Sequence, residues 1–316
     1  MKIIMINDCA YVGKTLIKYL PETFNVLHLT RSRCFFDKTF GVARRIFSTK
    51  GDLYHIHYLL QDCFLALRFG KHPLIGHAHG SDLRDTLHSK KWGWIVKYNL
   101  KNCDKILVAQ PTILKIAKEF NDTVEYFPIP YDSDLFYPKP VNPEREVKQI
   151  LLVSPHNFRV KGTDKFLYAL ARVKIPFKVK TISYGRDAAQ VNVLAKKLGL
   201  KVEFIPRVPH CKMSELYWDA DLVLGSFGIG QLDTVAIEAM ACGRPVIHSI
   251  KKEYFPHCPL RSYRNIDEVI EDIEMLLERK NAMKKIKQQY YYVRRVHSAK
   301  VLVKRLMNLY LVLKSN

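Results

Sequence analysis

The hydrophobic and polar positions of the chain follow two alternating spacings, and this predicts an α/β protein. Short apolar runs typical of buried strands alternate with segments in which apolar residues recur every three to four positions, the spacing of an amphipathic helix. The strands predicted in the first half are Lys2–Ile6, Asn25–Leu29, Leu53–His57, Leu74–His77 and Lys105–Ala109. The helices predicted between them are Gly13–Tyr19, Leu60–Phe69, Trp92–Leu100 and Thr112–Phe120. This alternation indicates parallel strands joined by crossover helices.

The second half repeats the alternation. Its predicted strands are Gln149–Val153, Phe177–Ser183, Val202–Ile205, Ala220–Leu224 and Pro245–Ile250. Its predicted helices are Thr163–Val173, Asp187–Leu198, Met213–Trp218, one that starts at Thr234, Asp267–Lys280, Lys284–Tyr292 and the terminal amphipathic helix Ser298–Leu313. A chain of 316 residues suits two domains of roughly 150 residues each.

We therefore expect two doubly wound, Rossmann-like α/β domains with a ligand in the cleft between them, at the carboxyl ends of strands. The proline-dense segment Pro128–Pro143 reads as the interdomain linker. The two expected domains cover residues 1–143 and residues 144–295. Residues 296–316 are expected to form a terminal helix that packs back on the first domain.

The segment Asp219–Ile247 carries the clearest chemical pattern. A short apolar strand gives way to the glycines Gly225, Gly228 and Gly230, and a helix then begins at Thr234 and carries Glu238 in its first turns. The start of a helix presents unpaired N–H groups that suit a phosphate. An ionised glutamate nearby is able to accept hydrogen bonds from a ribose diol. Together these features predict a nucleotide-diphosphate pocket.

The run IEAMACGRPVI, together with five other motifs, resembles the retaining glycosyltransferases of family four. The other motifs are DLYHIHYLL followed by LIGHAHGSDLR, VEYFPIPYDSDLFYP, FRVKGTDKFLYAL, VKTISYGRD, and VEFIPRVPHCKMSELYWDADLVL. Their order and spacing extend the resemblance over nearly the whole chain. It implies the GT-B fold, two Rossmann-like domains facing across a cleft, and a hexosyltransferase of class EC 2.4.

One position departs from the family pattern. Members carry two glutamates eight positions apart; the second matches Glu238, but the first is replaced by Gly230. The first glutamate of the family is thought to face the transferred sugar. Either Asp233 or the backbone amides around it then have to supply that contact.

The resemblance also assigns the donor site. Lys161 occupies the position of the diphosphate-binding lysine, and Arg159 is the accompanying arginine. The remaining expected donor-binding residues are Gly185, Arg207, Val208, Asp233, Thr234, Val235 and Glu238. No cofactor is expected beyond the nucleotide-diphosphate sugar as co-substrate, and catalysis is expected to be metal-independent.

The acceptor side is assigned to the first domain. His79, at a strand end before Gly80, matches the family histidine that contacts the donor sugar, and it is the expected catalytic residue together with Asp82. Asp82 either fixes the loop of His79 or touches the acceptor. Gly13 and Lys14 belong to the expected acceptor-side loop. His55 and His57 face one side of a strand, but a metal site there lacks an apparent third ligand.

Composition indicates the expected partners and cellular location of the protein. The net charge of +21 favours an anionic partner such as acidic lipid, and the basic segment Lys90–Lys101 with Trp92 and Trp94 suits a membrane surface. The seven cysteines are scattered without a CxxC motif, as in a reducing compartment. No apolar run approaches the roughly 20 residues that span a bilayer. We expect a cytoplasmic protein, peripheral at the inner membrane face, with a glycan or lipid-linked acceptor.

Other functions remain open at this point. The charge and the tyrosines also fit a nucleic-acid-binding protein, although no recognition module is present and nucleic acid is not the expected partner. Gly230 is compatible with a degenerate relative that binds a sugar nucleotide without transferring it. A sugar phosphorylase or a nucleotide-sugar epimerase on the same fold needs additional phosphate-binding or acid–base groups, which the sequence does not show.

Overall fold

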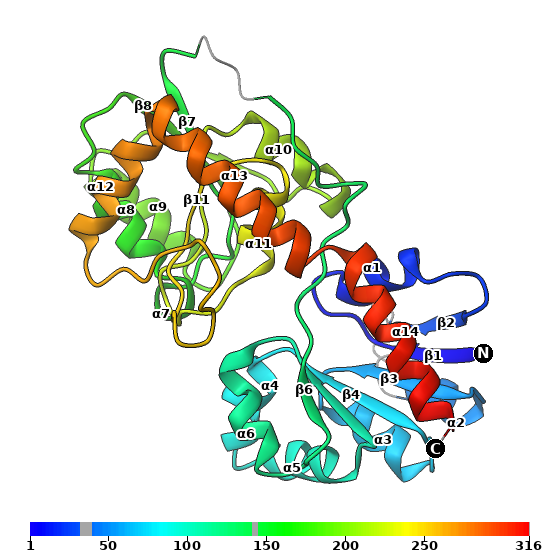
Figure 1. The fold of residues 1–316 in the computed structure, drawn as a ribbon. Coiled ribbons are helices and arrows are strands. Elements are labelled where there is room, and N and C mark those ends of the chain that lie inside the picture. Colours follow the sequence, from blue (N-terminus) through cyan, green and yellow to red (C-terminus); the bar gives the residue numbers. More distant parts are fainter. Residues whose placement is uncertain (32–39, 141–144, 316) are drawn as a thin grey trace. The chain divides into compact units, whose positions relative to one another are not determined.

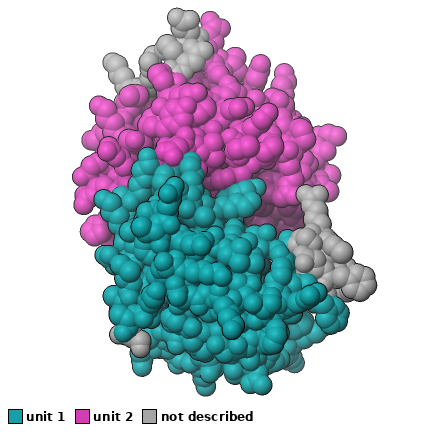
Figure 2. Space-filling view, turned by 90° about the vertical axis from the view of Figure 1, so that its right-hand side faces the viewer, with its two compact units in different colours: residues 1–130, 299–316 teal, residues 131–298 magenta. Residues whose placement is uncertain are grey.

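The structure is a computed structural model that describes residues 1–31, 40–140 and 145–315. The chain divides into two compact units, distinguished by colour in Figure 2. Unit 1 comprises Met1–Pro130 and Ala299–Asn316, and unit 2 comprises Tyr131–Ser298. Each unit is an α/β structure built around its own parallel sheet (Figure 1).

The described residues of unit 1 form a six-stranded parallel sheet in the order β2-β1-β3-β4-β5-β6. The strands are β1 (Lys2–Ile6), β2 (Asn25–Leu29), β3 (Leu53–His57), β4 (Leu74–Ala78), β5 (Lys105–Val108) and β6 (Val124–Tyr126). The helices are α1 (Val12–Tyr19), α2 (Val42–Ser48), α3 (Gln61–Arg68), α4 (Ser81–Arg84), η2 (Thr86–His88), α5 (Gly93–Asn102), η3 (Pro111–Ile113), α6 (Leu114–Lys118) and α14 (Ala299–Ser315). Both β3 and β4 are buried along their whole length, as expected for central strands covered on both faces.

The described residues of unit 2 form a five-stranded parallel sheet in the order β11-β10-β7-β8-β9. The strands are β7 (Lys148–Leu152), β8 (Phe177–Ile182), β9 (Val202–Ile205), β10 (Leu222–Leu224) and β11 (Val246–Ile247). The helices are α7 (Phe158–Lys161), α8 (Thr163–Leu170), α9 (Ala188–Lys197), η4 (His210–Lys212), α10 (Met213–Asp219), α11 (Thr234–Ala241), α12 (Ile266–Leu277) and α13 (Arg279–Val296). Read from β9, this is the strand order 3-2-1-4-5 of a doubly wound sheet, with the order reversing at β7.

The short helices α2, α4 and α7 were not predicted from the sequence, and two strands also differ from the prediction. The strand expected over Pro245–Ile250 is limited to Val246–Ile247, because His248 leaves the ladder. Its Nδ1 accepts a hydrogen bond from the Ser226 amide, and its Nε2 lies 2.7 Å from the Gln231 carbonyl oxygen. The edge strand β6 was not predicted: only its first residue, Val124, is fully buried, so it lacks an extended apolar run.

The boundary between the units lies near residue 130, earlier than the predicted boundary at residue 143. The difference has a clear cause, because the segment after Tyr131 packs on unit 2. Tyr137 contacts Trp218 at 4.8 Å between ring centroids, and the buried guanidinium of Arg244 donates to the carbonyl oxygens of Lys139 and Pro140. The proline-rich segment is thus partly a structural element of unit 2.

The terminal helix α14 belongs to unit 1, where it packs against α1 and β3. Its buried residues are Ala299, Leu302, Val303, Leu306 and Tyr310, which recur at helical spacing. The hydroxyl of Tyr310 lies 2.7 Å from Nδ1 of His55 on β3. Among the described residues, no helix has the combined length and apolarity that crossing a membrane requires.

Candidate functional site

The strand order of unit 2 predicts where a ligand binds. In doubly wound sheets, ligands bind at the carboxyl ends of the strands where the strand order reverses, because the loops there diverge and leave a crevice. In unit 2 this point lies between β7 and β10, which pair side by side. The segment after β7 leads to Lys161, and the segment after β10 leads to Asp233.

Lys161 and Asp233 meet at this switch point. The Lys161 Nζ lies 2.5 Å from Oδ2 of Asp233, and both side chains are about one-fifth exposed. Gly228 allows the two loops to touch, because a Cβ on it would lie 1.8 Å from the carbonyl oxygen of Val160. The Phe227 amide also donates to the Lys161 carbonyl oxygen. The lysine is therefore held against the glycine turn.

Asp233 caps the N-terminus of α11. Its Oδ1 accepts a hydrogen bond from the Ala236 amide, while Thr234 and Val235 begin the helix with amides that have no acceptor one turn earlier. Burial raises the pKa of Asp233, but the positive charge of Lys161 and the nearby His248 outweigh it and lower this pKa to about 2. The site therefore pairs a fixed carboxylate with a lysine beside a helix N-terminus, a place that favours anions.

Glu238 lies deeper, and only 3% of the residue is exposed. Its Oε1 is 2.6 Å from Nε2 of His210, and its Oε2 accepts a hydrogen bond from the Tyr217 hydroxyl. Burial raises the pKa of Glu238, and the contacts with His210 and Tyr217 oppose that rise. A ribose that reaches this carboxylate has to share it with His210 or displace it.

The other expected donor residues lie on neighbouring loops of unit 2. Arg207 stacks its guanidinium over the ring of Tyr184 at 4.6 Å, and Val208 follows it. Gly185 has a φ of +114°, and a Cβ there would lie 2.3 Å from the amide nitrogen of His156. Arg159 lies on α7, two residues before Lys161. Its side chain is exposed, whereas that of Lys161 is partly buried.

Gly230, the departure from the family pattern, occupies a position that disfavours a side chain. Its φ is +70°, a backbone conformation that glycine adopts without strain. A Cβ there would lie 2.6 Å from Cγ of Lys251 and 3.1 Å from its amide nitrogen, which donates to the Gly230 carbonyl oxygen. The turn at Gly230 therefore has little room for the glutamate side chain that the family carries at this position.

Replacing Gly230 with glutamate is expected to destabilise the protein by about 2–3 kcal/mol, since left-handed backbone strain adds to the overlap with Lys251. Gly199 is the matched control, because its φ is +69° and nothing lies within 4 Å of a Cβ built there. Gly199→Glu is expected to cost only about 1 kcal/mol. Urea denaturation of both variants measures the difference, and equal costs would refute the steric account of Gly230.

Unit 1 has its own switch point, between β1 and β3. The loop after β1 is strained, with positive φ at Asn7, Ala10 and Tyr11, and it leads into Gly13. A cavity of about 390 Å³ opens beside this loop. Its lining residues are Asn7, Asp8, Thr30, Arg31, Tyr58, Leu60, Gln61 and Asp62.

The two expected acceptor-side residues border different parts of this loop. The amide of Gly13 donates to Oδ1 of Asp8, and a Cβ on Gly13 would lie 3.0 Å from Nε2 of His57. Lys14 is exposed, with its Nζ 5.6 Å from the ring centroid of Tyr11. Gly13 thus lies against the histidines of the sheet, whereas Lys14 faces solvent.

His79 and Asp82 form one local unit after β4. The Asp82 carboxylate accepts hydrogen bonds from the amides of Leu59, His79, Gly80 and Leu83. Burial raises its pKa, and these amides oppose the rise. The half-buried His79 has Nε2 2.9 Å from Nδ1 of His57. The observed contacts of Asp82 are those of a residue that fixes the His79 loop.

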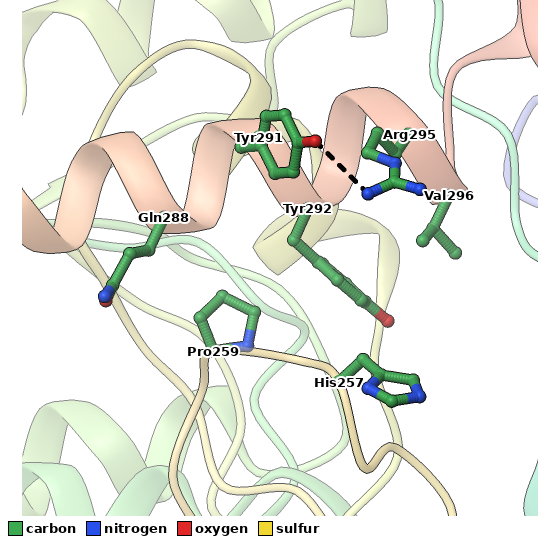
Figure 3. Close-up of a pocket in the computed structure, with 7 residues that line it drawn as sticks. All are labelled: His257, Pro259, Gln288, Tyr291, Tyr292, Arg295 and Val296. Atoms are coloured by element: carbon green, nitrogen blue, oxygen red, sulfur yellow. Dashed lines mark hydrogen bonds between the residues drawn. The ribbon is translucent and has the colours of Figure 1, made fainter.

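A separate cavity of about 730 Å³ lies between α13 and the segment that contains His257 (Figure 3). Its lining residues are His257, Pro259, Gln288, Tyr291, Tyr292, Arg295 and Val296. Arg295 donates to the hydroxyl of Tyr291 across one turn of α13. None of these residues belongs to the predicted donor or acceptor sets, so this cavity is distinct from the switch-point site.

Comparison with known protein families gives a match within unit 2. Residues 147–278 match the family model described as glycosyl transferases group 1. Comparison with curated protein sequences gives no significant match. The matched segment contains every predicted donor residue, and sugar transfer is the class of activity that the match supports.

Solved structures share the fold over essentially the whole chain. A sucrose-phosphate synthase from Thermosynechococcus elongatus is 16% identical, with a TM-score of 0.77 and 100% of both chains covered. Anabaena HepE, solved with UDP-glucose, is 14% identical, with a TM-score of 0.76, covering 99% of this chain and 100% of that one. The lipopolysaccharide outer core galactosyltransferase WaaB is 14% identical, with a TM-score of 0.63 and 99% of both chains covered. These similarities confirm the predicted GT-B fold class of two Rossmann-like domains.

Proposed function

We propose that the protein transfers a hexosyl group, with retention of anomeric configuration, from a nucleotide-diphosphate sugar to an acceptor hydroxyl. The observation that carries this proposal is the meeting of Lys161 with the N-terminus of α11 at the switch point of unit 2. Both features stabilise a departing diphosphate, the group on which negative charge develops as the glycosidic bond breaks. The similarity to a structure solved with UDP-glucose supports a uridine nucleotide as the first donor to test.

In the proposed reaction the bond between the anomeric carbon and the diphosphate oxygen breaks, and the acceptor oxygen bonds to the same face of the sugar. The acceptor proton passes to the departing diphosphate. Lys161, Arg159 and the amides of Thr234 and Val235 are proposed to hold that diphosphate without a metal ion. Glu238 is proposed to orient the ribose, and His79 to contact the donor sugar.

A panel of UDP-, GDP- and ADP-sugars tests the proposal, with release of the nucleoside diphosphate as the measured quantity. We expect release with at least one donor, unchanged by a chelator of divalent cations. The anomeric configuration of the new linkage in the product is measured by NMR. The same configuration as in the donor confirms retention. A failure to bind or turn over any donor refutes the proposal.

Gly230 favours a second candidate, a protein that binds the donor without transferring it. In the family the replaced glutamate is thought to face the sugar, and the turn at Gly230 has little room to restore it. Donor binding in the same panel, with neither hydrolysis nor transfer, identifies this alternative. Release of the nucleotide excludes it.

For the acceptor we propose a lipid-linked or envelope glycan at an anionic membrane surface. The support is an exposed basic and aromatic face around α5, defined by Lys90, Lys91, Trp92, Trp94, Lys97 and Lys101. Trp92 and Trp94 are 38% and 54% exposed, and Lys91 Nζ lies 5.0 Å from the Trp92 ring. Aromatic rings flanked by lysines suit the interface of an anionic bilayer.

Vesicle co-sedimentation tests this surface. The double variant Lys91→Gln/Lys97→Gln is expected to bind vesicles containing anionic lipid about 30-fold less tightly, at about 1 kcal/mol for each lysine removed. The matched control is Lys174→Gln/Lys178→Gln, which removes two exposed lysines from unit 2. Equal losses in both double variants, or equal binding to neutral vesicles, would contradict the proposed surface.

A further inference from the structure

The core of unit 1 contains a stack of histidines that the proposed function does not use. His55 and His57 lie on one face of β3, and His77 on β4 is in register with His57. All three side chains are fully buried. Their rings stack with centroid distances of 4.9 Å for His55–His57, 5.3 Å for His55–His77 and 5.1 Å for His57–His77. His77 supplies the third ligand that was not apparent from the sequence beside His55 and His57.

The three rings bring their nitrogens into a small volume. One nitrogen from each ring lies within 4.8 Å of the others, and His55 Nε2 is 3.2 Å from His77 Nδ1. In a tetrahedral zinc site with bonds of about 2.0–2.1 Å, neighbouring ligand nitrogens are about 3.3 Å apart. The His55–His77 pair already has this spacing. A spacing at the 4.8 Å limit has to shorten by about 1.5 Å to reach this value.

Two of the buried nitrogens have no hydrogen-bond partner among the described residues: Nε2 of His57 and Nε2 of His77. Leaving such a group unpaired in a protein core is unfavourable, because it loses its hydrogen bonds to water without replacement. Coordination of a cation through Nε2 of His57 satisfies that nitrogen. Nε2 of His77 is satisfied in the same way if His77 binds through it rather than through Nδ1, the nitrogen that lies near His55. Unsatisfied nitrogens on two of the three clustered rings are therefore an independent indication of a missing ligand.

The outer nitrogens of His55 and His57 are already oriented. Nδ1 of His55 lies 2.7 Å from the hydroxyl of Tyr310 on α14, and Nδ1 of His57 lies 2.9 Å from Nε2 of His79. Histidines that ligate a metal usually give their other N–H to such a partner, which fixes the tautomer and the ring orientation.

We propose that His55, His57 and His77 form a buried structural site for one divalent transition-metal ion of the zinc type. Three imidazoles without a carboxylate select zinc, cobalt, nickel or copper over magnesium and calcium. The ion would tie β3 to β4 and, through Tyr310, to α14. The cluster borders the proposed acceptor side, because His57 contacts His79, but metal content is measured without reference to sugar transfer, so the two proposals can fail separately.

The test measures metal in the full-length chain, expressed in zinc-supplemented medium and freed of any histidine tag. After gel filtration in a weak chelator, elemental analysis is expected to find about one zinc per wild-type chain. His55→Gln and His77→Gln are each expected to lower this to less than one-fifth. His88→Gln, which removes an exposed histidine of unit 1, is expected to leave it unchanged. Metal-free wild-type protein, or an equal loss in the His88→Gln control, overturns the proposal.

A second measurement needs no variant and so remains informative where the glutamine variants fail to fold. X-ray absorption of the zinc-loaded wild-type protein is expected to show a nitrogen shell with the scattering pattern of at least three imidazoles. Zinc should also raise the melting temperature, whereas magnesium should not, because only a ligand of the folded state stabilises it. A shell dominated by sulfur or by oxygen would refute the site.

Discussion

Replacing Lys161 with alanine is expected to weaken binding of the nucleoside diphosphate by about 100- to 1,000-fold, or about 3–4 kcal/mol, while the fold is kept. The lysine lies beside the N-terminus of α11 and is only about one-fifth exposed, so its charge is poorly screened by water. Isothermal titration with the diphosphate that binds the wild-type protein most tightly measures the effect.

Two further variants separate diphosphate binding from a purely structural role. Lys165→Ala removes an exposed lysine of the next helix, α8, whose Nζ lies 4.5 Å from the ring centroid of Phe227. It is expected to change affinity less than threefold. Asp233→Asn keeps a capping oxygen on α11 but frees Lys161 from its ion pair, and it is expected to tighten binding. Unchanged affinity in Lys161→Ala would remove Lys161 from the diphosphate site.

Replacing Arg244 with alanine is expected to destabilise unit 2 by about 4 kcal/mol. This arginine is fully buried, and its guanidinium donates to the carbonyl oxygens of Tyr217, Trp218, Lys139, Pro140 and Gly243. Its loss leaves a cavity and several buried acceptors without donors, each of which costs about 1–3 kcal/mol. Urea denaturation followed by tryptophan fluorescence measures the change, since Trp218 lies beside the guanidinium.

Arg264→Ala is the matched control, because Arg264 is exposed and belongs to the same unit. It is expected to change stability by less than about 0.5 kcal/mol. Hydrogen exchange should also show that residues 137–140 lose protection in Arg244→Ala alone. If that segment stays protected and stability is unchanged, Arg244 does not anchor the linker to unit 2.

Four strands could be predicted from sequence to the residue because each is a short run rich in apolar residues. Lys2–Ile6, Asn25–Leu29, Leu53–His57 and Val202–Ile205 agree residue for residue with β1, β2, β3 and β9. The strand expected over Pro245–Ile250 failed because Ser249 and Ile250 are buried against loops, and burial alone does not distinguish a strand from a covered loop. The division near residue 130 could not be read from the proline-rich segment, because the sequence does not reveal that the buried Arg244 binds the carbonyl oxygens of Lys139 and Pro140.

Some residues of the candidate site could be identified from the sequence, and others could not. Lys161, Asp233 and Glu238 were identified from local motifs, and the structure brings Lys161 and Asp233 together across 72 residues. The partners of Glu238 were missed: His210 and Tyr217 come from η4 and α10, and no local pattern connects them to α11. His77 was missed as a neighbour of His55 because the register of two parallel strands is a tertiary property.

Hydrogen exchange of the full-length chain with and without saturating nucleoside diphosphate tests the central claim, that the donor binds at the switch point of unit 2. We predict protection of residues 157–163 and 229–238, which carry Lys161 and the start of α11, and no change in residues 288–296 along the separate cavity. Protection confined to residues 257–259 and 288–296, or to unit 1 alone, would contradict the account.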